Sequence, residues 1–92
     1  MTWPALQRRR FARQYKKLHN NTAADVDSAV ETIARDPQLG KRKKGDLAAL
    51  RTHKFHSGGL LYLLGYTLDD SVRLVYLEAV GLHENFYRDL KR

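Results

Sequence analysis

The sequence predicts an α+β domain in which an N-terminal helical hairpin packs on a small twisted antiparallel sheet of three to four strands, with a short C-terminal helix. Apolar residues repeat with the helical period of 3.6 in residues 9–33 and with the strand period of two in residues 47–80. Tight-turn residues separate the predicted strands, and strands joined by tight turns pair antiparallel. A length of 92 residues is typical of one domain, so residues 1–92 are expected to form a single unit.

Two amphipathic helices are predicted in the N-terminal half. Their apolar positions follow the spacing i, i+4, i+7: Phe11, Tyr15 and Leu18 in the first helix, and Val26, Val30 and Ile33 in the second. Asn20 and Asn21 are expected to break the first helix, and residues 22–25 resemble a capping box for the second. The second helix should end at Asp36, because the residue before a proline is pushed out of the α region.

Three strands are predicted in the C-terminal half, followed by the terminal helix after Gly81. The predicted spans are Leu47–Phe55, Leu60–Leu68 and Val72–Val80. Gly58–Gly59 and Asp69–Asp70 supply the turns between them. The middle span is apolar throughout, which is typical of a central strand buried on both faces. Pro4 restricts any strand in residues 2–7 to a sheet edge, and residues 39–46 are expected to form a basic loop.

The chain is strongly basic, with a formal net charge of +7 and a sequence pI of about 10.0. The excess lies in the N-terminal half, where residues 1–46 hold eleven of the 17 Lys and Arg residues but only five of the ten acidic ones. A domain with this charge usually binds a polyanion such as nucleic acid, an acidic membrane face or an acidic protein. A generically basic surface is the alternative.

Several classes of protein are not indicated. The chain has no cysteine, which excludes disulfides and thiolate metal sites. No metal or other cofactor is expected, because His53, His56 and His83 lack carboxylates at metal-ligand spacing and no glycine-rich phosphate-binding motif is present. No apolar run approaches the roughly 20 residues of a membrane span, and no secretory signal is evident. The expectation is a cytoplasmic protein that does not bind a membrane.

The C-terminal segment carries the strongest chemical signal. A spacing of four residues places His83 and Tyr87 on one face of the predicted terminal helix. An imidazole titrates near neutral pH and can move protons, and a phenol can relay a proton or bind a phosphate oxygen. Glu84 could orient the imidazole or act as a base. The alternative is a surface helix on which these side chains merely pack.

The first predicted strand carries a second set of polar residues. Alternation puts Lys54 and His56 on one face, and Phe55 on the other. Because Phe55 should face the core, the cation and the imidazole should face solvent or substrate, where a fixed cation can neutralise charge on a phosphate. Arg51 would reach the same side only through a bulge or from the exposed end of the strand.

Further cations are candidate phosphate contacts. Lys43 and Lys44 belong to the run of four cations in residues 41–44, which could bind a nucleic-acid backbone without sequence preference. Arg73 is an isolated cation of the third strand. A solvated surface is the alternative reading for each of these side chains.

The chain resembles the RelE/ParE superfamily of toxins from bacterial type II toxin–antitoxin modules. The resemblance rests on residues 10–18, 43–47 and 50–55, and is strongest in the terminal segment Gly81-Leu-His-Glu-Asn-Phe-Tyr-Arg-Asp-Leu90. It implies a helical hairpin on a twisted antiparallel sheet. For RelE-like members it also implies a metal-independent endoribonuclease that cuts mRNA in the ribosomal A site, and a cognate antitoxin that wraps and blocks the toxin in a hetero-oligomer.

The resemblance also implies roles for residues at matching positions. His83 matches the general acid or base, Tyr87 its neighbour at the reacting phosphate, and Lys54 a strand cation at the scissile region. The chain departs from the pattern at Leu61, where several members carry an arginine that binds the scissile phosphate. Arg51, His56 or Arg73 could fill that role. The ParE branch, whose members inhibit DNA gyrase without cutting RNA, is the alternative function.

Overall fold

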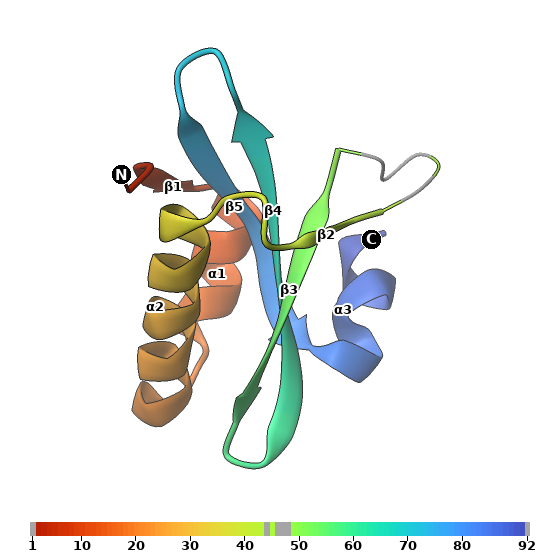
Figure 1. The fold of residues 1–92 in the computed structure, drawn as a ribbon. Helices are drawn as coiled ribbons and strands as arrows, with labels where there is room; N and C mark the ends of the chain where they lie inside the picture. The colour runs from red at the N-terminus through yellow and green to blue at the C-terminus, as the bar shows by residue number, and fades with distance from the viewer. Residues whose placement is uncertain (1, 44, 46–48, 92) are drawn as a thin grey trace.

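The structure, a computed structural model, describes residues 2–43, 45 and 49–91. Its elements are, in chain order, β1 (Ala5–Gln7), α1 (Arg9–Lys16), α2 (Asn20–Arg35), β2 (Lys41–Arg42), β3 (Arg51–Ser57), β4 (Leu60–Asp69), β5 (Leu74–Leu82) and α3 (His83–Leu90). Helices α1 and α2 cover one face of the sheet, and α3 lies on the other face (Figure 1). None of the helices in the described part of the chain is long and apolar enough to cross a membrane.

The sheet has five strands in the order β1-β5-β4-β3-β2. The β5–β4, β4–β3 and β3–β2 pairs are antiparallel, whereas β1 runs parallel to β5. The predicted α+β class is confirmed, but the prediction of an antiparallel sheet of three to four strands is wrong. Strand β1 falls within residues 2–7 and lies at a sheet edge, the position to which the sequence restricts it, whereas β2 was not predicted. The two strands have only three and two residues, so neither is long enough to show an apolar period. Strand β1 pairs with β5, which lies far along the chain, and β2 pairs with β3, which begins at Arg51.

The predicted break between the N-terminal helices is displaced. Asn20 and Asn21 begin α2, and His19 is its N-cap, without a capping side-chain hydrogen bond. The predicted capping box at residues 22–25 is therefore wrong. The Thr22 hydroxyl instead accepts a hydrogen bond from Ser57 Oγ at 3.2 Å, which ties α2 to the end of β3. The predicted end at Asp36 is confirmed, since Asp36 is the C-cap of α2.

The strand boundaries also differ from the prediction. The first long strand begins at Arg51, with residues 47 and 48 outside the described residues. The last strand runs two residues later than predicted, because the turn before it extends through Arg73, whose φ is 53°. Gly58 and Gly59 form the predicted hairpin turn, with φ values of 57° and 78° that favour glycine. The predicted basic loop contains β2.

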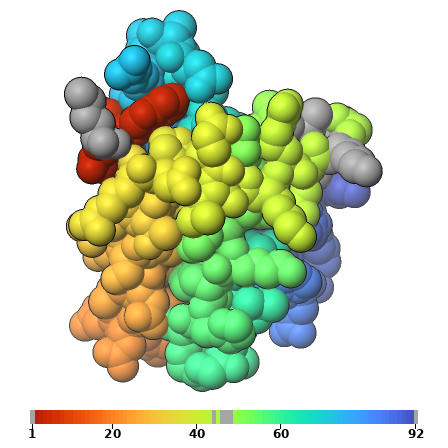
Figure 2. Space-filling model, in the orientation of Figure 1, coloured from red at the N-terminus to blue at the C-terminus, as the bar shows by residue number. Residues whose placement is uncertain are grey.

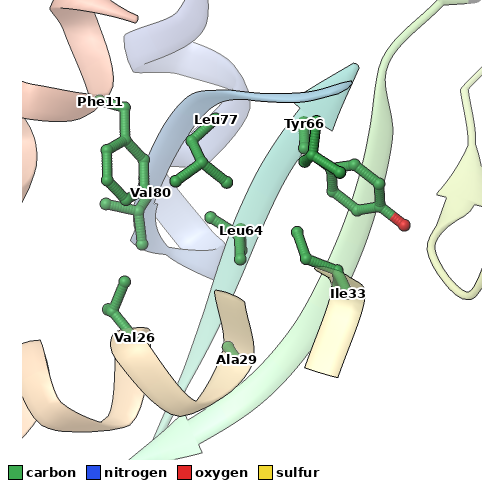
Figure 3. Close-up of a cluster of buried hydrophobic side chains, with 9 residues drawn as sticks. Phe11, Val26, Ala29, Ile33, Leu64, Tyr66, Leu77 and Val80 are labelled. Atoms are coloured by element: carbon green, nitrogen blue, oxygen red, sulfur yellow. The ribbon is translucent and has the colours of Figure 1, made fainter. Parts of the chain in front are cut away.

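The main core lies between the sheet and the two N-terminal helices (Figure 3). Its buried members are Phe11, Val26, Ala29, Ile33, Leu64, Tyr66, Val75, Leu77 and Val80. Strand β4 is the central strand, and four consecutive residues, 63–66, are buried in it. This confirms the prediction of a strand covered on both faces, because neighbouring side chains on a strand point to opposite sides.

A second, smaller core fixes α3 to the opposite face of the sheet. Phe86 is buried there with Leu50, Leu63 and Ala79. Burying a side chain of this size contributes about 1.5–3 kcal/mol. The ring lies directly over Gly65, where an added Cβ would be only 2.7 Å from Phe86 Cζ. The absence of a side chain at this position therefore allows α3 to lie close to the sheet.

We expect Gly65→Ala to destabilise the fold by about 1–3 kcal/mol, because overpacking a filled core forces side chains or backbone to shift. The free energy of unfolding from urea titration measures this loss. Gly81→Ala is the matched control, since a Cβ there has no heavy atom within 4 Å and its φ is not positive. Equal stability of the two variants would contradict the close contact between Phe86 and Gly65.

Candidate functional site

A cleft with a volume of about 400 Å³ lies between the β2–β3 edge of the sheet and α3. The described residues that line it are Leu39, Lys41, Lys43, Thr52, His53, Lys54, Leu63, His83 and Tyr87. The lining therefore includes three lysines, two histidines and one tyrosine, and these lining residues include no carboxylate. Such a cleft favours an anionic ligand, because charges of one sign in a concave surface add their potentials.

Strand β3 directs Lys54 toward this cleft. The neighbouring ring of Phe55 faces the α1–α2 side, where it stacks on Tyr62 with 5.6 Å between the ring centroids. Lys54 is exposed and lies opposite Leu63, which belongs to the core under α3. Because directly opposed residues of paired strands share a face, the amine lies on the α3 side. It does not point into the hydrophobic interior.

Helix α3 brings His83 and Tyr87 to the same cleft. The helix begins at His83, directly after β5, and the buried ring of Phe86 holds it to the sheet. Phe86 also makes an edge-on contact with the ring of Tyr87, with 5.1 Å between centroids. The four-residue spacing thus gives the shared face that the sequence predicts, and both side chains line the hollow. Their chemical roles remain predictions.

Strand β2 and the residue after it add two cations. Lys41 lies opposite Thr52, and the Lys43 amide donates to the carbonyl of Leu50 at 3.0 Å. The Lys43 ammonium lies 5.0 Å from the centroid of the Tyr87 ring, within range of a cation–π contact. Lys43 is a predicted phosphate contact, and Lys41 belongs to the same basic run of residues 41–44. A spacing of two residues places Lys41 and Lys43 on one face of an extended segment, but the sequence predicts a loop here.

A buried hydroxyl holds the segment that leads into β2. The Tyr66 ring belongs to the main core, and its oxygen points away from the other labelled side chains (Figure 3). It donates to the carbonyl of Pro37 at 2.9 Å and accepts from the amide of Gly40 at 2.8 Å. Burial raises the pKa of Tyr66, partly opposed by the Gly40 amide and the charge of Arg51, so the hydroxyl keeps its proton. A Cβ at Gly40 would collide with this ring.

Arg51 acts on the same segment from the face of β3 opposite to Lys54. Its guanidinium donates to the Gly40 carbonyl at 3.1 Å and to Gln38 Oε1 at 2.9 Å. The surface view shows this segment, in yellow, running over the upper part of the molecule toward β2 (Figure 2). The structure therefore does not bring Arg51 into the cleft. The bulge that Arg51 would need to reach the side of Lys54 is absent from the described β3–β4 pairing. The register shift that the sheet does contain lies in the β4–β5 pairing.

The other predicted site residues lie outside the cleft or outside the described residues. His56 is exposed on the same face as Lys54, opposite Leu61, but does not line the hollow. Arg73 lies in the β4–β5 turn and does not line the cleft. Glu84 lines a different hollow. Lys44 is not among the described residues.

Thr52 and His53 also line the cleft, although neither is a predicted site residue. Thr52 shares the face of Lys54, whereas His53 lies opposite Leu64 of the main core and so on the other face of β3. Their position beside Lys54 on β3 was the only signal in the sequence. Burial lowers the pKa of His53, because desolvation disfavours the charged imidazolium. The described part of the chain contains no cluster of three or more His, Cys, Asp or Glu residues that could hold a metal ion.

The sequence matches a family of bacterial toxins. Residues 5–91 match the family model of the ParE-like toxins of type II bacterial toxin–antitoxin systems. The chain therefore belongs to this family, within the RelE/ParE superfamily that the sequence resembles. No curated protein sequence matches the chain.

Solved structures of RelE toxins share the fold. A chain of the RelBE2 toxin–antitoxin complex of Mycobacterium tuberculosis superposes with a TM-score of 0.79 and 22% identity, covering 90% of this chain and 100% of that one. The free Escherichia coli toxin RelE, as a double arginine-to-alanine mutant, gives 0.78 and 18%, covering 99% and 92%. The intact Escherichia coli RelBE complex gives 0.72 and 19%, covering 87% and 95%. These similarities confirm the predicted RelE-like architecture.

We expect Tyr66→Phe to lower the free energy of unfolding by about 1–3 kcal/mol, because it leaves the Gly40 amide and the Pro37 carbonyl without their buried partner. Chemical denaturation measures the change. Tyr62→Phe is the matched control, since that tyrosine stacks on Phe55 and makes no hydrogen bond with any described residue. A Tyr66→Phe variant as stable as the control would show that the hydroxyl does not hold the segment.

Proposed function

We propose that this toxin is a metal-independent endoribonuclease that cuts mRNA on the ribosome and thereby inhibits translation. The observation that carries the proposal is the presence of Lys54, His83 and Tyr87 around one cationic cleft. An imidazole beside fixed ammonium groups supplies proton transfer and charge stabilisation, which are the two requirements for cleaving a phosphodiester without a metal. The RelE fold of the structural neighbours supports the same assignment.

In the proposed reaction the RNA supplies its own nucleophile. The 2′-oxygen attacks the adjacent phosphorus in line, loses its proton to a base, and the bond from phosphorus to the 5′-oxygen breaks. The products are a 2′,3′-cyclic phosphate and a 5′-hydroxyl that has gained a proton. His83 moves protons and Tyr87 binds a phosphate oxygen or relays a proton. Lys54, with Lys41 and Lys43, neutralises the charge that builds on the phosphorane.

The proposed regulatory partner is a cognate antitoxin. Two of the similar structures are described as toxin–antitoxin complexes, and a third as RelE with a peptide of its antitoxin RelB. The net charge of +7 suits an acidic, partly disordered segment that folds on this surface. Toxin and antitoxin would form a hetero-oligomer in the cytoplasm, and release of the toxin would expose the cleft to ribosome-bound mRNA.

A second candidate function is inhibition of DNA gyrase. The observation that favours it is the description of the matching family as ParE-like. Under this alternative the toxin would bind its target without cutting RNA, and the cleft residues would have no catalytic role. The two functions therefore predict that different processes fail first in a cell that expresses the toxin: translation for a nuclease, and DNA integrity for a gyrase inhibitor.

We expect His83→Ala and Lys54→Ala each to slow cleavage of ribosome-bound mRNA by about 10²–10⁴-fold, the typical contribution of a positioned proton-transfer group or of an electrostatic contact to a transition state. Cleavage rates and growth inhibition are the measurements, with folding verified by circular dichroism. The matched controls are His19→Ala and Lys16→Ala, which change exposed residues of the α1–α2 region. Undiminished cleavage by His83→Ala would exclude this imidazole from catalysis.

Pulse labelling after induction of the toxin separates the two functions. A nuclease should stop incorporation of labelled amino acids before DNA damage is detectable, whereas a gyrase inhibitor should cause DNA breaks while translation continues. Loss of DNA integrity first, with mRNA intact, would contradict the proposed endoribonuclease.

A further inference from the structure

A second hollow adjoins the cleft on the other side of His83. It has a volume of about 260 Å³ and is lined by Leu60, Leu61, Leu82, His83 and Glu84. It lies between the start of β4 and the start of α3, toward the lower end of the sheet in Figure 1. His83 lines both hollows, so the two are neighbours on the surface.

The second hollow is lined by leucines and a carboxylate, whereas the cleft is lined by cations. Three leucines form its walls, and Leu60 is 53% exposed. Its described lining contains no lysine or arginine. Glu84 makes no hydrogen bond or ion pair with any described residue, so its carboxylate is free to accept hydrogen bonds. A phosphate would be repelled here.

The strands connect the two hollows along a single track. On the α3 side of the sheet, the opposed pair Lys54–Leu63 is followed by the pair His56–Leu61. Two residues along a strand advance about 7 Å, on the order of one nucleotide of an extended single strand. An RNA whose phosphate lies at the lysines would therefore place a neighbouring base near Leu61 and Glu84.

We propose that the second hollow is a subsite for the nucleobase next to the scissile phosphate, and that Glu84 selects a base that carries an exocyclic amino group. This inference rests on the proposed function and adds its substrate preference. The leucines contact the apolar faces of the base, as unstacked bases of single-stranded RNA require. The carboxylate accepts from the amino group of adenine, cytosine or guanine. Uracil has no exocyclic amino group, and the two carbonyl oxygens that flank its single N3–H donor are repelled by the carboxylate.

The test compares ribosome-bound mRNAs that differ only in the nucleotide flanking the cut. The wild-type toxin should cleave the substrates with adenine, cytosine or guanine at least about 10-fold faster than the one with uracil, the discrimination expected of a good base-edge contact. Glu84→Gln should reduce this ratio toward one, because a carboxamide both donates and accepts. Glu31→Gln, which removes an exposed carboxylate from α2, should leave the ratio unchanged. An unchanged ratio in Glu84→Gln, or no base preference in the wild type, would overturn the subsite.

A binding experiment separates this inference from the nuclease assignment. Isotopically labelled toxin is titrated with tetranucleotides that carry a 2′-deoxy nucleotide at the cut and therefore cannot be cleaved. The NMR signals of Leu61 and Glu84 should shift with the amino-bearing bases and shift less with uracil. If no mRNA is cleaved but these shifts occur, the proposed nuclease is wrong and the subsite stands. If neither signal shifts with any tetranucleotide, the subsite is wrong.

Discussion

The contact of Phe86 with Gly65 is the constraint on which the site depends. It holds α3 against the face of the sheet that the N-terminal helices leave uncovered. With α3 at this distance, His83 and Tyr87 line the same cleft as the amine of Lys54. A helix of eight residues is too short to be stable by itself, so this packing, and not intrinsic helix propensity, positions its functional side chains.

On β3, residues that stabilise the fold face one side of the sheet, and the residue with a proposed chemical role faces the other side. Phe55 and Arg51 face the α1–α2 side, where one stacks on Tyr62 and the other holds the segment before β2. Lys54 faces the cleft, and Arg51 affects that cleft only indirectly, by fixing the path of the chain that presents Lys41. The charge of a residue therefore does not identify a ligand contact, because its face on the strand decides what it can reach.

The position of His83 between two hollows of contrasting chemistry suggests how a small toxin could combine reaction and selection. The cationic cleft suits the phosphate, and the leucine-lined hollow with its single carboxylate suits a base. Leu61, which breaks the pattern of an arginine at the scissile phosphate, belongs to the second hollow. The cations among the described cleft residues are Lys41, Lys43 and Lys54, and none of them comes from β4.

The sequence by itself determined where the longer helices and strands lie and which candidate site residues share a face of one helix or strand. Apolar period identified α1, α2, β4 and β5, and local spacing placed Lys54 opposite in direction to Phe55, and His83 on one face with Tyr87. Only the tertiary structure decided that β1 pairs parallel with β5, that β2 exists, that Arg51 holds a backbone segment, and that Glu84 lies outside the cleft. The reason is that periodicity reports which side of an element a residue occupies, whereas two-residue strands and contacts between distant segments form only when the whole chain packs.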